Sequence, residues 1–113
     1  MSERDDPELI QDILEAARRI TSYTAGLTYE TFLADIKTQD AVTRNLEIVG
    51  EAVKKLSHVL RDAHPNIPWR SMSGLRDRLI HDYFGVNLDI VWEIASKELP
   101  EIVPELEEIA SRK

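Results

Sequence analysis

Residues 36–60 decide the fold, and they read IKTQDAVTRNLEIVGEAVKKLSHVL. Their apolar residues recur at alternating steps of four and three: Val42, Leu46, Val49, Val53, Leu56 and Leu60. This spacing keeps the side chains on one face of an α-helix. Such a stripe is suited to lying against antiparallel helices. We therefore expect one long helix from about Ile36 to Leu60.

Gly50 lies inside this predicted helix, where glycine costs about 1 kcal/mol relative to alanine. One compensation would be the close approach of another backbone. Gly50 and Glu51 could also lie at a subunit interface, or they could serve plain helix packing, and the sequence favours neither.

The remainder of the chain also has helical periodicity and carries no repeat or linker. The other expected helices have these bounds: Asp5 or Asp6 to Gly26, about Tyr29 to Leu33, Trp69 to Gly85, and Asn87 to the end of the chain. Pro100 and Pro104 would interrupt or kink the last one. The expected fold is all-α, a bundle of four to five helices forming a single domain over residues 1–113. We expect Trp69 and Trp92 to anchor its core.

Composition narrows the function classes. The chain has 113 residues and no cysteine, which excludes a disulfide scaffold, a thiol nucleophile and a thiolate zinc site. The acidic start has no apolar core of the kind a secretory signal needs. No apolar run approaches the roughly 18 residues that span a membrane. We expect a soluble, cytoplasmic protein that does not enter a membrane.

The charge is unevenly distributed. The net charge of −7 argues against nucleic-acid binding over the whole surface. Residues 37–81, however, hold eight Lys or Arg against five Asp or Glu, so a basic middle lies between acidic ends. This pattern fits either solvated helix faces or a local basic site on an acidic body.

One short stretch, residues 74–85, concentrates reactive side chains and reads GLRDRLIHDYFG. It holds two arginines, two aspartates, a histidine and a tyrosine. His81 can transfer protons near neutral pH, and Arg76 can stabilise charge on a phosphate. In RNA the ribose 2′-hydroxyl can supply the nucleophile, so such a site needs neither a metal nor a cofactor. The sequence has no motif for either.

Helix geometry limits this hypothesis. On one straight helix Arg76 and His81 would point about 140° apart, whereas Arg76 and Tyr83 would share a face to within about 20°. Either the helix ends before His81, or two subunits share the site across a two-fold interface. A simpler arrangement is also open, because Asp77 with His81 and Arg78 with Asp82 are possible i,i+4 ion pairs. The arginine–histidine spacing alone favours that structural role.

Four blocks of sequence bear on this choice. They are residues 41–53 (AVTRNLEIVGEAV), 65–69 (PNIPW), 74–86 (GLRDRLIHDYFGV) and 89–92 (DIVW). In this order they resemble the HepT-like family of HEPN domain proteins over nearly the whole chain. The resemblance is far more specific than the arginine–histidine spacing.

The resemblance implies an all-helical homodimer that acts as a metal-independent ribonuclease, the toxin of a toxin–antitoxin pair. The family's R-x4-H-x-Y motif maps onto Arg76, His81 and Tyr83, with Asp77 at its usual polar position. Arginine and histidine then cut RNA, either mRNA or tRNA, at the dimer cleft. The implied partner is an MntA-type nucleotidyltransferase antitoxin, which adds AMP to the tyrosine.

Further RNA contacts are expected from the basic residues near the motif. Arg78 is the leading candidate, whereas Arg44 and Arg70 are more readily explained as members of surface salt bridges. Two other functions remain open: a non-catalytic helical module that presents Tyr83 to a nucleotidyltransferase, and a purely structural helical dimer.

Overall fold

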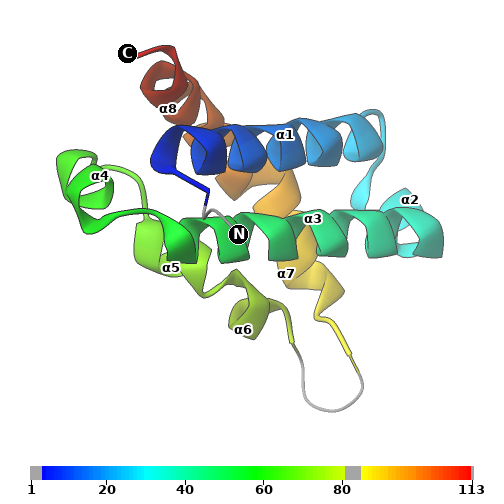
Figure 1. Ribbon diagram of the computed structural model, residues 1–113. Coiled ribbons are helices and arrows are strands. Elements are labelled where there is room, and N and C mark those ends of the chain that lie inside the picture. The colour runs from blue at the N-terminus through cyan, green and yellow to red at the C-terminus, as the bar shows by residue number, and fades with distance from the viewer. Residues whose placement is uncertain (1–3, 81–84, 113) are drawn as a thin grey trace.

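Three long helical rods build the protein. The computed structural model describes residues 4–80 and 85–112. Helix α1 (Asp6–Thr24) lies against α3 (Ile36–Lys55), and the third rod is a continuous run of α7 (Leu88–Glu93), η2 (Ile94–Glu98) and α8 (Leu99–Ser111). Figure 1 shows the last rod passing behind the first two. The predicted all-α bundle is confirmed.

The contact between α1 and α3 forms the centre of the core. Asp5 caps α1 in a capping box with Glu8, which satisfies backbone donors at the start of the helix. On α3 the predicted stripe is buried: Val42, Leu46, Val49 and Val53 are inaccessible to solvent. The stripe is therefore used within one chain. Burial of each such side chain stabilises the fold by about 1.5–3 kcal/mol.

The predicted helix from Ile36 to Leu60 is wrong in its end point. Helix α3 ends at Lys55, Leu56 is extended, and the separate helix α4 (His58–Ala63) follows. A long-range contact explains the break. The carboxylate of Asp6 accepts hydrogen bonds from the backbone N–H and the hydroxyl of Ser57, and the Ser57 hydroxyl oxygen in turn caps α4.

The predicted helix from Trp69 to Gly85 is also wrong in its extent. The structure has two short helices, α5 (Trp69–Ser73) and α6 (Leu75–Leu79), which meet at Gly74. After Leu79 the helix ends, because Ile80 is extended at φ −75° and ψ 129°. The predicted stop at Gly85 therefore comes too late, and Gly85 instead has φ +123°, a conformation that favours glycine.

Asp35 and a short helix lie just before the start of α3. Asp35 caps α3, and Thr38 donates two hydrogen bonds to its carboxylate, which lowers the pKa of Asp35. The predicted short helix is confirmed as α2 (Tyr29–Leu33), and its buried Phe32 packs on Trp92 with 5.1 Å between ring centroids.

Trp69 is buried as predicted, and its indole N–H donates to a backbone carbonyl.

The third rod is helical from its Asn87 cap onward, as predicted, but Pro100 and Pro104 do not break it. The backbone instead widens into a π-helical turn at η2, where the N–H of Leu99 donates to the carbonyl of Ile94. This turn lies just before Pro100, whose ring would crowd the carbonyl four residues earlier in a regular α-helix. No helix among the described residues is long and apolar enough to cross a membrane.

Gly50 lies where α3 meets the two short helices. A Cβ atom built at Gly50 would lie 3.3 Å from the carbonyl oxygen of Met72 and 3.6 Å from the Cβ of Leu75. The predicted close approach of a second backbone is therefore present. It explains why a glycine is tolerated in the middle of a helix.

We expect Gly50→Val to destabilise the fold by about 1–3 kcal/mol, because its two extra methyl groups would push against the Met72 carbonyl. Chemical denaturation measures this change. Glu51→Val is the matched control, since it places the same β-branched residue on the exposed side of the same helix. Equal free energies of unfolding for the two variants would contradict the packing role of Gly50.

Candidate functional site

The short helix α6 presents two of the predicted site residues. Arg76 and Asp77 are exposed, whereas Leu75 and Leu79 on the same turn are buried in the core. Helix α6 has only five residues and no side-chain cap. A helix this short is not stable alone, so its position comes from the surrounding structure.

The chain leaves α6 before it reaches the predicted histidine. Ile80 pairs with Val86 in an isolated antiparallel bridge, and the N–H of Asn87 donates to the carbonyl of Leu79 over 2.7 Å. The two ends of the segment 81–84 are thus held side by side. Of the two geometries left open by the sequence, a helix that ends before His81 is confirmed. The angular separation expected on one straight helix therefore does not apply.

Other members of the predicted site lie outside the described residues. They are His81 and Tyr83, together with Asp82, the proposed ion-pair partner of Arg78. The roles of His81 and Tyr83, and the i,i+4 pairs that involve His81 and Asp82, remain predictions.

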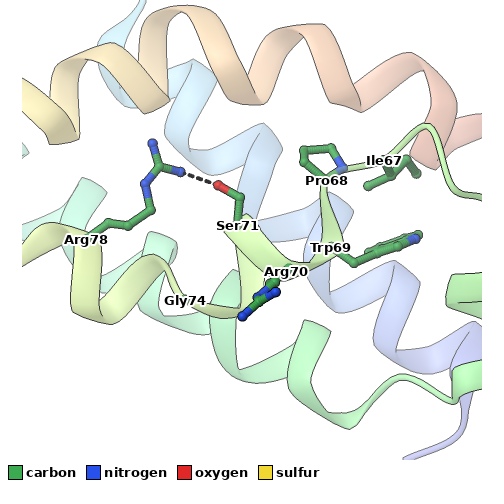
Figure 2. Close-up of a pocket in the computed structure, with 7 residues that line it drawn as sticks. All are labelled: Ile67, Pro68, Trp69, Arg70, Ser71, Gly74 and Arg78. Atoms are coloured by element: carbon green, nitrogen blue, oxygen red, sulfur yellow. Dashed lines mark hydrogen bonds between the residues drawn. The ribbon is translucent and has the colours of Figure 1, made fainter.

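Arg78, predicted as an RNA contact, has protein partners. Its guanidinium donates to the hydroxyl of Ser71 over 2.8 Å and to the carboxylate of Glu98 over 2.9 Å. Figure 2 shows Arg78 reaching from α6 toward Ser71 on α5. Neither Ser71 nor Glu98 was predicted as a partner of Arg78, and they lie 7 and 20 residues from it in the sequence. No local pattern signals either contact.

A surface hollow of about 680 Å³ adjoins Arg78. Its lining also includes Ile67, Pro68, Trp69 and Arg70, which Figure 2 draws as sticks. A second hollow is lined by Arg44 of α3 and by Val86, which pairs with Ile80. Arg44 is thereby placed near the candidate site, whereas its predicted role as a surface salt bridge finds no partner among the described residues.

The exposed charges on α5 and α6 differ from those on α8. Arg70 and Arg76 are exposed on α5 and α6. The outer face of α8 carries exposed acids at Glu101, Glu107 and Glu108, which repel a polyanion. Exposed arginines on α5 and α6 fit a local basic site on an acidic body, and they fit solvated helix faces equally well. Within the described ranges no group of three or more His, Cys, Asp or Glu side chains could hold a metal ion.

These features define a class of protein. It is an all-α bundle in which an exposed arginine, on a helix of about one turn, precedes a segment whose flanking residues, Ile80 and Val86, are paired. The sequence matches the family described as Ribonuclease HepT-like over residues 13–109. The chain therefore belongs to the HepT-like ribonuclease family.

Curated relatives agree with this assignment. A protein of Methanocaldococcus jannaschii, named as a candidate RNase, is 44% identical over 96% of this chain and 90% of its own length. A probable ribonuclease HepT of Thermococcus cleftensis is 41% identical over 94% of this chain and 96% of its own. A candidate RNase of Caldanaerobacter subterraneus is 40% identical over 91% of this chain and 92% of its own length. No solved structure matches the chain significantly.

Proposed function

We propose that the protein is a metal-independent endoribonuclease in which Arg76 and His81 cut RNA. The observation that carries this proposal is the end of α6 at Leu79, because it removes the helical constraint that would point the two side chains apart. Membership of a ribonuclease family supports the same activity. The exposed arginines beside α6 supply the charge that attracts the RNA backbone.

The reaction needs only the substrate and these two side chains. His81 takes the proton from a ribose 2′-hydroxyl, whose oxygen attacks the adjacent phosphorus. The bond from phosphorus to the 5′ oxygen breaks, and the leaving oxygen takes up a proton from solvent water. Arg76 stabilises the added negative charge of the transition state. The products are a 2′,3′-cyclic phosphate and a free 5′-hydroxyl.

We expect the unmodified protein to cleave RNA in EDTA and to leave a 2′,3′-cyclic phosphate or its hydrolysis product. His81→Ala should lower the rate by a factor of about 10² to 10⁴, because it removes the proton-transfer group. Arg76→Lys should restore little of the activity lost in Arg76→Ala, because a point charge does not replace the planar guanidinium. Gel assays and mass spectrometry of the products measure this.

Arg18→Ala, an exposed arginine on α1, is the matched control and should cleave at the wild-type rate. Activity lost on chelation and restored by a divalent ion would count against the mechanism. Wild-type cleavage by His81→Ala would contradict the role of the motif.

The active form in this proposal is a two-fold homodimer with a shared cleft. The apolar stripe of α3 is buried inside the chain, so it does not supply the interface. Ile80 and Val86 support the proposal instead, since these apolar side chains at the base of the loop are 51% and 38% exposed. A second copy would remove them from water.

Mixing Arg76→Ala with His81→Ala protein tests the shared cleft. If each site takes Arg76 from one subunit and His81 from the other, a mixed dimer holds one intact site and regains activity. Cleavage assays after exchange of subunits, together with light scattering, measure this. A monomer at micromolar concentration contradicts the shared cleft, whereas a proven mixed dimer without recovery assigns Arg76 and His81 of each site to the same subunit.

We also propose that the protein is the toxin of a toxin–antitoxin pair, silenced by a cognate MntA-type nucleotidyltransferase that adds AMP to Tyr83. The tyrosine oxygen would attack the α-phosphorus of ATP, pyrophosphate would leave, and the phenolic proton would pass to solvent. The attached AMP adds bulk and negative charge two residues from His81. It would therefore compete with the RNA phosphate for Arg76.

Tyr83→Phe should retain much of the nuclease activity but should gain no AMP mass when incubated with the partner enzyme and ATP. Wild-type protein should gain it and lose activity, and mass spectrometry with a parallel cleavage assay measures both. Equal mass gain by Tyr83→Phe would contradict the assigned tyrosine. Modification of a wild-type protein that never cleaves RNA would favour a non-catalytic partner module.

A further inference from the structure

Three elements meet at the guanidinium of Arg78. The side chain belongs to α6, its first hydrogen bond goes to Ser71 of α5, and its second goes to Glu98 of η2. The side chains of Arg78 and Glu98 are 33% and 39% exposed, so the ion pair is partly shielded from water. It joins elements 20 residues apart in the sequence.

Helix α6 needs such a contact to fix its orientation. Leu75 and Leu79 anchor its buried side, but residues at i and i+4 lie one above the other on a single face. Two apolar anchors along one line leave rotation about that line weakly controlled. Arg78 supplies a third point away from this line, and its planar guanidinium fixes direction as well as distance.

The π-helical turn brings Glu98 to this contact. Glu98 is the last residue of η2, where the hydrogen bond from Leu99 to Ile94 spans five residues instead of four. One extra residue in a helical turn rotates the positions on either side relative to each other by about 100°. Turns of this kind are frequent at functional sites. The wide turn thus sets the direction in which Glu98 points relative to the earlier part of the rod.

We propose that Arg78 and Glu98 are positioning residues for Arg76. Their ion pair holds the single turn of α6 so that the Arg76 side chain faces the scissile phosphate. This inference rests on the proposed ribonuclease activity of Arg76. It assigns Arg78 a role in orienting the site and gives Glu98 a function, whereas an RNA contact would need the Arg78 guanidinium to face the ligand.

A positioning role and an RNA-contact role of Arg78 predict different effects of Glu98→Ala on kcat and on RNA binding. If the pair orients Arg76, Glu98→Ala lowers kcat about 10- to 100-fold while KM stays within about twofold. If Arg78 binds RNA, the same variant frees the guanidinium and removes a negative charge, so kcat is kept and RNA binding stays equal or tightens. Glu98→Gln keeps an acceptor oxygen and should give an intermediate kcat.

A charge exchange tests whether the pair acts as a unit. Arg78→Glu combined with Glu98→Arg should recover at least tenfold in kcat over the weaker single variant, because the opposite charges face each other again. Glu93→Gln is the matched control, since it makes the same charge change on the same rod in an exposed i,i+4 pair with Lys97. It should keep the wild-type kcat.

RNA binding is measured separately in a His81→Ala background, where no cleavage interferes. Arg78→Gln should leave Kd and its salt dependence unchanged. A weaker Kd with a salt slope reduced by about one would identify a phosphate contact and overturn the proposal. Circular dichroism melting identifies variants that fail to fold, for which the milder Glu98→Gln decides.

The outcomes distinguish failure of the ribonuclease activity from failure of the positioning role. Wild-type protein that does not cleave RNA contradicts the proposed function, and the backbone amide resonances of Arg76 then test the pair directly. These resonances should shift in Glu98→Gln and stay in place in Glu93→Gln. Active wild-type protein together with Glu98→Ala that keeps the wild-type kcat overturns the positioning role alone.

Discussion

The close contact at Gly50 is the constraint on which the candidate site depends. Helices α5 and α6 are too short to be stable alone, so they take their positions from α3. The missing side chain at Gly50 lets the backbone at Met72 approach α3 closely. Buried Leu75 and Leu79 then fix α6 against the core. The position of Arg76 on α6 therefore depends on the absence of a Cβ atom at Gly50.

The long helices were predictable because their information is local. Apolar residues at steps of three and four mark the buried faces of α1 and α3, and Asp5 and Asn87 act as caps as expected. The breaks at Leu56 and Gly74 were not predictable from this pattern, because the apolar spacing continues through both. At Leu56 the decisive partner is Asp6, 51 residues away from Ser57. Periodicity contains no such information.

The candidate site also has features that were predictable from the sequence and features that were not. The sequence identified Arg76 as a candidate catalytic residue, and it offered a helix end before His81 as one of two geometries. It could not choose between them, because the end of α6 depends on the pairing of Ile80 with Val86. It also gave no signal for Glu98, since the partner of Arg78 depends on how a π-helical turn orients the third rod. Reactive residue types are visible in a sequence, whereas the contacts that orient them are set by tertiary packing.

The loop after α6 is closed by main-chain atoms. The bond from Asn87 to Leu79 joins a backbone N–H to a backbone carbonyl, and the bridge between Ile80 and Val86 is also a backbone pairing. Neither contact specifies a side chain within residues 81–84. Because backbone atoms make both contacts, neither depends directly on which side chains Leu79, Ile80, Val86 and Asn87 carry. The anchors on either side of residues 81–84 are in this respect encoded by backbone geometry rather than by particular side chains.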